Sequence, residues 1–474
     1  MDQAVWGILH GQPFLNSDTF NVAISRLGIH FDPILALFAP FYLVVPSVIW
    51  LILAQAVALP LASLPIYFLA RSATQSQAAA FFWATAYLFS PFVLSAASWD
   101  FHPVSLAVPF IALAFLALER QSFRLLLMCC LVLLLCKEHL GLLVAGFGLL
   151  WLVRYREFTR SALLMLTGLG GFVLIMKALI RAFSPTGQHL MLYTDAGHIS
   201  RYGWLGASLE EVFLKLLTQP VETMQHVLFG MDGWLYLLLL LLPLLFLPLI
   251  GFELLLPGMA DLLANLLSST PMPRSIFAYH SITLVPVLVV AAIHGSCRIH
   301  HCWRRASSEL QAFAVVALTL ALAWLFFPFF ALPGGSGFWA PKQVLRFHDA
   351  DYAVVRDLIS PEMSVSVQAN LGAHFTQRYE AYIYPEKVDD VDAVILRLNS
   401  PAVVQKKRGL ASLSHHLQME PYEYLASIRD LGERRKGDGV VGVDPGLIVF
   451  KKGGGAADIA TISAKIKTLE TEWR

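Results

Sequence analysis

The sequence predicts a mainly α-helical fold, a polytopic membrane bundle of about ten spans that is followed by a small extracytoplasmic α/β domain. The composition is the first observation behind this class, because 57% of the 474 residues are hydrophobic and only 14% are charged. The mean hydropathy is accordingly high, at +0.63. The second observation is that runs rich in Leu and Phe recur along most of the chain. Such runs can cross the bilayer as helices of about 20 residues.

The charge balance argues against nucleic acid as a partner. The formal net charge is only +1, whereas binding to phosphates requires a concentrated basic surface. The expected surroundings of the chain are membrane lipids.

Ten apolar segments are predicted to be membrane helices, with boundaries that are soft by several residues. They are 47–70, 77–96, 103–118, 122–137, 138–153, 161–183, 233–250, 252–268, 278–296 and 310–332. Four regions follow from this assignment. They are an outer N-terminal loop with an amphipathic or re-entrant segment (1–46), the bundle (47–333), an α/β domain (334–452) and a flexible hinge with a helical tail (453–474).

The stretch LVLLLCKEHLGLLV places Lys137, Glu138 and His139 inside an apolar run. As one helix, the run would hold these ionisable residues in mid-bilayer and place its two basic flanks, ERQSFR and RYREFTR, on opposite sides. As a hairpin, both flanks share one side. Since short basic loops favour the cytoplasm, the hairpin is preferred, and Lys137, Glu138 and His139 then lie at the opposite surface.

The same alternation assigns a side of the cell (inner) membrane to every loop. The strongly basic short loops fall on the cytoplasmic side, and they contain Arg71, Arg120 with Arg124, Arg154 with Arg156 and Arg160, and CRIHHCWRR. The outer side receives residues 1–46, the turns SWDFHP and KEH, a loop from about 184 to 232, PMPRSIFAYH and everything after Pro333. Because Met1 begins a polar stretch without a signal peptide, we expect a further helix upstream to carry it across.

The composition changes after Pro333. DYAVVRDLI and PYEYLASIRDLGERR are predicted to form helices, and MSVSVQAN, YEAYIYP and DAVILRL are predicted to form short strands. GVVGVDPGLIVFKKG is predicted to be a final strand, and the chain ends in a Gly hinge and a helical tail.

Several motifs give the chain a resemblance to a known family. They are DQAVWGILHGQPF, HFDPILALFAPFYLVVPS, SWDFHPVSLAVP, LLCKEHLGLL, RYGWLG and VSVQANLGAHFTQR. In this order they resemble an uncharacterised family of predicted prokaryotic membrane proteins, a domain of unknown function. That family is usually grouped with the GT-C glycosyltransferases, which use polyprenyl-phosphate-linked sugars as donors.

The resemblance implies a GT-C-like fold and an inverting sugar transfer at the outer leaflet. Such a transfer needs a carboxylate to take the proton from an acceptor hydroxyl, and cations to stabilise the departing lipid phosphate. Two departures matter. The family normally has a helix before the DQ motif, and many relatives read KED where this chain has His139.

Three carboxylates are the candidate catalytic residues: Asp2, Asp100 and Glu138. The resemblance maps an acid of the first outer loop, which in GT-C enzymes acts as a base or metal ligand, to Asp2. An unconstrained terminal residue is the structural alternative. Asp100 stands before Pro103 and also fits a helix cap, and Glu138 also fits an interfacial ion pair with Lys137.

Six further residues are candidates for binding the donor phosphate or the substrate: His30, His102, Lys137, Arg201, Arg274 and His280. Lys137 suits the phosphate as a compact cation, and Arg201 suits it as a bidentate donor. Each also has a structural explanation, since basic and aromatic residues are common near headgroups. No cofactor is predicted with certainty, and a divalent cation remains an option.

The leading hypothesis is a GT-C-like glycosyltransferase that transfers sugar from a polyprenyl phosphate to an unknown glycan, lipid or protein acceptor. The absence of a GxGxxG motif argues weakly against a soluble nucleotide sugar as donor. A transporter or lipid-handling permease is the first alternative, but the polar residues gather on one face and no inverted repeat is evident. A noncatalytic envelope-assembly scaffold is the second alternative.

Overall fold

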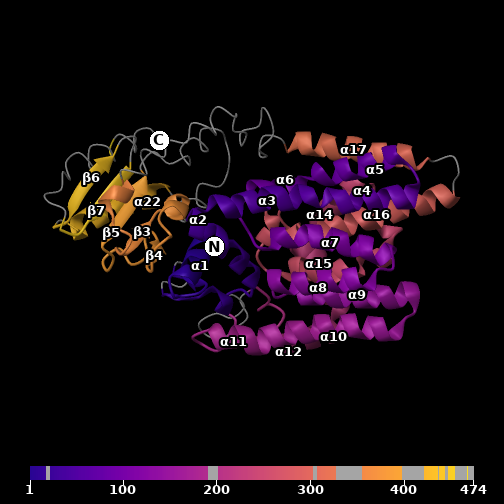
Figure 1. The fold of residues 1–474 in the computed structure, drawn as a ribbon, viewed down its shortest axis with the longest axis horizontal. Helices are drawn as coiled ribbons and strands as arrows, with labels where there is room; N and C mark the ends of the chain where they lie inside the picture. The colour runs from indigo at the N-terminus through magenta and orange to yellow at the C-terminus, as the bar shows by residue number, and fades with distance from the viewer. Residues whose placement is uncertain are drawn as a thin grey trace. The chain divides into compact units, whose positions relative to one another are not determined.

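The structure is a computed structural model that describes residues 1–17, 22–190, 201–302, 307–326, 355–397, 421–435, 437–443, 447–453 and 467 (Figure 1). Its contacts divide the chain into two units. The helical unit comprises Leu27–Leu37 and Ile49–Ala340, and the mixed unit comprises Met1–Arg26, Phe38–Val48 and Pro341–Arg474. The N-terminal 46 residues are thus shared between the two units.

The helical unit contains the apolar segments, which fold into helices with roughly parallel axes (Figure 1). Its helices before the first gap are α3 (Ile49–Leu61), α4 (Ser63–Thr74), α5 (Gln77–Leu88), α6 (Pro91–Ser98), α7 (Val104–Glu119), α8 (Phe123–Cys136), α9 (Leu140–Tyr155), α10 (Phe158–Leu174) and α11 (Ile180–Phe183). Those that follow are α12 (Leu209–Thr218), α13 (Pro220–Gln225), α14 (Gly233–Leu241), α15 (Met259–Leu267), α16 (Leu284–Cys302) and α17 (Ser308–Leu325).

The membrane character of the chain is confirmed by the length and hydropathy of these helices. Four of the described segments are long and apolar enough to cross a bilayer, namely Ile49–Thr74, Phe158–Phe183, Leu284–Cys302 and Ser308–Leu325. Two bent pairs, Gln77–Leu88 with Pro91–Ser98 and Pro220–Gly230 with Gly233–Leu244, raise the number to six. α7, α8 and α9 are apolar but shorter. The count of ten spans stays a prediction.

The predicted hairpin between residues 123 and 153 is confirmed. α8 ends at Cys136, α9 begins at Leu140, and the chain turns between them at Lys137, Glu138 and His139. The backbone N–H of Leu140 donates a hydrogen bond to the carbonyl oxygen of Lys137, with an N–O distance of 3.2 Å. The three ionisable residues therefore lie at the ends of two helices and not in the middle of one.

Small residues let α9 and α10 pack closely. A Cβ atom built on Gly168 would lie 2.4 Å from the backbone nitrogen of Ala145, and one built on Gly141 would lie 2.7 Å from the carbonyl oxygen of Gly168. Contacts this short exclude any side chain at either glycine. The packing holds the start of α9, next to Glu138, against α10.

Two predictions for residues 184–250 are wrong. The predicted outer loop contains α12 and α13, and Ser208 begins α12 by accepting a hydrogen bond from the backbone N–H of Glu211. This Ser-x-x-Glu pattern is a helix start signal in the sequence. The predicted helix 233–250 is broken, because the left-handed backbones of Leu245 and Phe246 separate α14 and the short turn that follows it from the next turn, Leu247–Leu249.

The mixed unit contains a five-stranded sheet in the order β4-β3-β5-β7-β6. β3 (Val365–Val367) pairs in parallel with β4 (Ala381–Ile383) and β5 (Ala393–Arg397), and β7 (Leu447–Lys451) pairs antiparallel with β5 and with β6 (Gly439–Val443). The three short strands and the helix α22 (Pro421–Arg434) are thus confirmed. The single final strand is wrong, since this segment forms the two strands β6 and β7.

The N-terminal residues of the mixed unit form α1 (Asp2–Leu9), the short antiparallel pair β1 (Leu15–Asn16) and β2 (Ile24–Ser25), and α2 (Ala39–Val44). The side-chain amide of Gln3, on α1, donates to the carbonyl oxygen of Arg378 at 3.0 Å. The chain start therefore packs on the C-terminal part of the same unit. The first half of the predicted helix DYAVVRDLI and nearly all of the predicted tail lie outside the described residues.

Candidate functional site

Glu138 is the centre of a buried group of ionisable side chains in the helical unit. Its Oε1 atom lies 3.0 Å from Nδ1 of His30, 3.6 Å from Nε2 of His189 and 3.9 Å from Nζ of Lys137. Its Oε2 atom accepts a hydrogen bond of 3.0 Å from the backbone N–H of Phe31. Only 7% of Glu138 is exposed, so each contact acts with little screening by water.

The close approach of two loops explains how His30 and His189 meet. A Cβ atom on Gly28 would lie 2.7 Å from the carbonyl oxygen of Phe183, the last residue of α11. Because Gly28 has no side chain, the segment before His30 can lie directly on the end of α11. His189 follows that end by six residues in sequence, and its ring meets the His30 ring edge to face, with centroids 5.8 Å apart.

The charges of the site keep Glu138 ionised. Burial raises the pKa of Glu138, but the positive charges of Lys137 and His30 outweigh burial and hold this pKa well below its usual range. The carboxylate therefore carries its charge at neutral pH. A carboxylate with such a low proton affinity is a weak base, and its chemistry is to hold cations and to orient hydrogen-bond donors.

Arg201 and His280, from distant parts of the sequence, lie near this turn. Burial, together with the nearby charges of Arg201, Lys137 and His139, lowers the pKa of His280 to about 4. Arg201, Lys137 and His280 belong to the predicted phosphate-binding set, and the charges of Arg201 and Lys137 both act on His280. Arg201 is placed by its carbonyl oxygen, which accepts a hydrogen bond of 2.8 Å from the N–H of Ser269.

A second carboxylate lies beside the turn. Oδ1 of Asp261, on α15, is 3.7 Å from Nε2 of His139, and Oδ2 of Asp261 accepts a hydrogen bond of 2.7 Å from Thr283. Asp261 is buried. The chain therefore supplies a carboxylate next to the position where the KEH motif has His139.

The turn SWDFHP contributes aromatic and polar groups to the same unit. His102 stacks on Tyr279 with ring centroids 3.6 Å apart, and Tyr279 in turn stacks on His280 at 4.4 Å. Gln55 fixes the turn, because its Oε1 accepts hydrogen bonds from the N–H of His102 and its Nε2 donates to the carbonyl of Trp99. The stacking of His102 on Tyr279 ties the turn to the segment that carries His280.

The three predicted catalytic carboxylates have different surroundings. Asp100 is exposed, and its carbonyl oxygen lies 2.8 Å from Nδ1 of His102. Asp2 lies in the mixed unit, where it is buried and accepts hydrogen bonds from Tyr42 at 2.6 Å, Thr376 at 2.7 Å and Gln377 at 3.2 Å. Asp2 is thus an ordered residue and not an unconstrained terminal one.

Arg274 has a structural function in the described contacts. Its Nη1 donates to the carbonyl oxygens of Asn265 and Leu266, at 3.3 and 3.2 Å, and also to that of Ser268. These oxygens belong to the C-terminal end of α15, where a helix has unpaired acceptors and favours a cation. Binding of a donor phosphate by Arg274 stays a prediction.

Two residues of the site were not predicted from the sequence. His189 is a single histidine in a polar loop, and no spacing distinguishes it from other loop histidines. Asp261 could have been found, because it interrupts the apolar segment 252–268, and an ionisable residue within such a segment marks a functional position by default.

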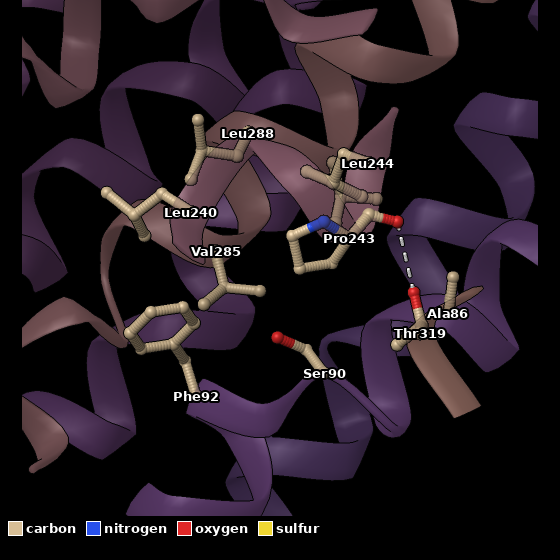
Figure 2. A pocket seen from close by; sticks show the side chains of 10 residues that line it. Ala86, Ser90, Phe92, Leu240, Pro243, Leu244, Val285, Leu288 and Thr319 are labelled. Atoms are coloured by element: carbon tan, nitrogen blue, oxygen red, sulfur yellow. Dashed lines mark hydrogen bonds between the residues drawn. The ribbon is translucent and has the colours of Figure 1, made fainter. Parts of the chain in front are cut away.

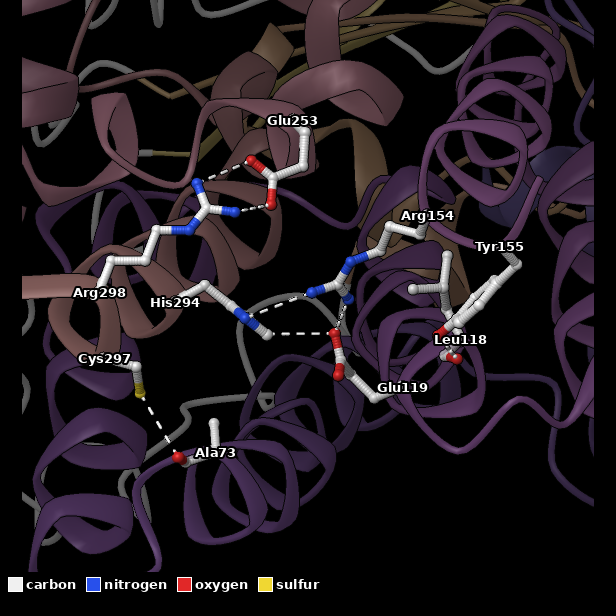
Figure 3. A network of polar contacts seen from close by, with 9 residues as sticks. All are labelled: Ala73, Leu118, Glu119, Arg154, Tyr155, Glu253, His294, Cys297 and Arg298. Atoms are coloured by element: carbon white, nitrogen blue, oxygen red, sulfur yellow. Dashed lines mark hydrogen bonds and ion pairs between the residues drawn. The ribbon is translucent and has the colours of Figure 1, made fainter. Parts of the chain in front are cut away.

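The opposite end of the helical unit carries a separate network of charges (Figure 3). The Glu119 carboxylate, at the end of α7, pairs with Arg154 of α9 and lies 3.1 Å from Nε2 of His294 on α16. Arg298 pairs with Glu253 in the same view. None of the predicted site residues takes part in it, and each of its carboxylates has a cationic partner.

A small pocket lies elsewhere in the helical unit (Figure 2). Its walls are mainly apolar and include Phe92, Leu240 and Leu288. The Thr319 hydroxyl donates to the carbonyl oxygen of Pro243 at 3.3 Å, the one hydrogen bond drawn there. No charged residue lines this pocket, so it offers no groups for acid–base or phosphate chemistry.

Comparison with known proteins gives one family. The sequence model of a family described as "Predicted membrane protein (DUF2079)" matches residues 1–430. Comparison with curated proteins finds no match. Because the family match covers most of the 474 residues, the chain belongs to the DUF2079 family of predicted membrane proteins.

Proposed function

We propose that the protein is a GT-C-like, inverting glycosyltransferase that moves a sugar from a polyprenyl phosphate to a hydroxyl of an envelope acceptor. The observation that carries the proposal is the arrangement around Glu138. An ionised, buried carboxylate is surrounded by Lys137, His30 and His189, and Arg201 and His280 are close by. Such a cationic end of a membrane bundle suits a phosphate group.

The reaction assigns a separate task to each group. The acceptor oxygen forms a bond to C1 of the sugar, while the bond between C1 and the phosphate oxygen breaks and its electrons pass to the lipid phosphate. Lys137 and Arg201 stabilise the negative charge of that leaving phosphate. His280, neutral at pH 7 because of its low pKa, offers a hydrogen bond without adding charge.

Glu138 is occupied by its contacts with cations, so the proposal gives the proton of the acceptor to another carboxylate. Asp100 is placed for this task, because it is exposed and lies on the turn whose His102 stacks on Tyr279, next to His280. Glu138 then holds Lys137 and His30 in place. In this scheme Asp100 acts on the chemical step, and Glu138 acts on donor binding.

The site must lie at the outer leaflet, where the sugar of a flipped lipid donor is exposed. The basic short loops that contain Arg71, Arg120 and Arg154 lie at the other end of the helical unit in this proposal, and they favour the cytoplasmic side of the inner membrane for that end. The sidedness and the extracytoplasmic location of the C-terminal domain are parts of the proposal.

The test is transfer of radiolabelled sugar from a panel of polyprenyl-phosphate sugars, in membranes that contain the protein and an envelope extract. Asp100→Asn is expected to lower kcat by about 100-fold or more with little change in KM. Glu138→Gln is expected to raise KM for the donor. Glu157→Gln, an exposed carboxylate at the other end, is the matched control. Transfer that is equally fast in all variants, or absent with every donor, would reject the proposal and favour a transporter or a scaffold.

A further inference from the structure

The side chains of His30, Glu138 and His189 form a group with the composition of a metal site. One possible ligand atom from each residue lies within 4.8 Å of the other two, and no other group of three such residues was found in the described part of the chain. The three residues come from separate segments, an N-terminal loop, the turn between α8 and α9, and the segment after α11. Their meeting is therefore a product of the fold.

The distances between these atoms approach those of a tetrahedral metal centre. With bonds of about 2.0–2.1 Å to zinc, two ligand atoms of a tetrahedron lie about 3.3 Å apart. Oε1 of Glu138 is 3.0 Å from Nδ1 of His30 and 3.6 Å from Nε2 of His189. These two distances are within a few tenths of an ångström of the tetrahedral value, and all three ligand atoms lie within 4.8 Å of one another.

The surroundings orient the carboxylate for such a role. Oε2 of Glu138 is held by the backbone N–H of Phe31, which leaves Oε1 directed at the two imidazoles. In metal sites, hydrogen bonds to the oxygen of a carboxylate that does not bind the metal hold the ligand in its orientation. The result is a carboxylate prepared to bind through one oxygen.

His189 supplies an independent observation. The residue is 7% exposed, and its Nδ1 atom is buried without a hydrogen-bond partner among the described residues. A buried imidazole with incomplete hydrogen bonding is costly, and the contact of Nε2 with Glu138 is long, at 3.6 Å. A bond from Nε2 to a metal would give this ring a stronger interaction than that long contact.

The geometry points to a site for one divalent cation of the zinc class, bound by His30, Glu138 and His189, with a fourth position open for water or a substrate oxygen. Two imidazoles and one carboxylate favour zinc or a similar ion over magnesium or calcium, which prefer oxygen ligands. Lys137, 3.9 Å from Oε1, has a flexible side chain that can move away from the cation. The inference stands whether or not the protein transfers sugars.

The test measures metal binding directly, on full-length protein in detergent that carries no polyhistidine tag. After equilibration with zinc and removal of the excess, the wild type is expected to retain about one zinc per chain. His30→Ala, His189→Ala and Glu138→Ala are each expected to lose it. Bound cobalt is expected to give the visible absorption of a tetrahedral centre in the wild type and none in these variants.

Two controls separate this site from adventitious binding. His139→Asn removes the histidine that follows Glu138 in sequence. The ring of His139 lies beside Asp261. His300→Ala with His301→Ala removes the two adjacent histidines near the end of α16. Both controls are expected to retain the zinc.

Zinc is also expected to raise the melting temperature of the wild type and of the controls, but not that of the ligand variants. This readout requires only that each variant is folded at the start, and Glu138→Gln serves if Glu138→Ala does not fold. A wild type that retains no zinc, or zinc that persists in His30→Ala and His189→Ala, would overturn the inference. Loss of zinc from the His300/His301 control alone would identify adventitious binding and overturn it as well.

Discussion

The guanidinium of Arg154, at the end of α9, pairs with the carboxylate of Glu119, at the end of α7 (Figure 3). Because Glu119 stands just before α8, this ion pair brings the two ends of the α8–α9 hairpin to the same end of the helical unit. His294 of α16 joins them through a contact of 3.1 Å with Glu119. The relationship shows why the basic flanks of the hairpin share one side.

This ion pair is expected to contribute to stability. Both side chains are largely shielded, with exposed fractions of 21% for Arg154 and 26% for Glu119. A double-mutant cycle with Glu119→Gln and Arg154→Gln is expected to give a coupling free energy of about 1 kcal/mol or more. The measurement is reversible unfolding in mixed detergent micelles. The pair of Glu157 with Arg160, about half exposed, is the control and should give under about 0.5 kcal/mol. Equal couplings would contradict the geometry.

The close packing of α9 on α10 predicts a large difference between two glycines of α10. Gly168→Ala places a methyl group 2.4 Å from the backbone of Ala145, and it should lower the free energy of unfolding by about 1–3 kcal/mol. Gly170→Ala meets no atom within 4 Å. It should be neutral, or stabilising by up to about 1 kcal/mol through its helix propensity. Similar losses in the two variants would show that α9 and α10 do not pack in this way.

Much of the helical unit could be predicted because hydrophobic runs and basic loops are local signals. The turn at Glu138 followed from the cost of placing Lys137, Glu138 and His139 in mid-bilayer. The break in the predicted helix 233–250 could have been predicted, because Pro243 and Pro248 lie inside this segment and each begins a short turn of the structure. The left-handed backbones of Leu245 and Phe246, between the two prolines, have no such signal in their residue types.

The candidate site could be predicted only in part, for a related reason. His30, Lys137 and Glu138 stood out as polar residues in outward turns, but their meeting with His189 depends on how Gly28 packs against Phe183. A contact between residues so far apart in sequence leaves no local pattern.

The two final strands of the mixed unit could have been predicted from a local signal. The Asp-Pro-Gly sequence between β6 and β7 is a turn signal, and it predicts two strands in place of one.

The proposed sidedness can be tested by cysteine labelling. Cys302, exposed at the end of α16, is expected to face the cytoplasm, and a cysteine at the exposed position of Asp100 is expected to face outward. In a chain whose other native cysteines are replaced, a membrane-impermeant maleimide should label Asp100→Cys in intact cells. It should label Cys302 only after permeabilisation. The reverse pattern would remove the outer-leaflet site and, with it, the proposed lipid donor.

The low pKa of His280 predicts a specific loss of stability in acid. Burial and the charges of Arg201, Lys137 and His139 lower this pKa from an ordinary value of 6.5 to about 4. An unfolded chain therefore binds a proton at His280 more readily than the folded protein does. Stability should fall as the pH is lowered from 6.5 towards 4, and it should be unaffected by this group above 6.5.

His280→Gln removes the titrating group and keeps a polar side chain of similar reach. Between pH 7 and pH 4.5, the wild type is expected to lose roughly 2 kcal/mol more unfolding free energy than the variant does. Unfolding in mixed micelles at a series of pH values measures the difference. His226→Gln, which replaces a histidine whose ring contacts Trp204 at a centroid distance of 4.8 Å, serves as the matched control. Identical pH profiles for the wild type and His280→Gln would mean that His280 protonates freely, and that the cations from residues 137, 139 and 201 do not gather around it.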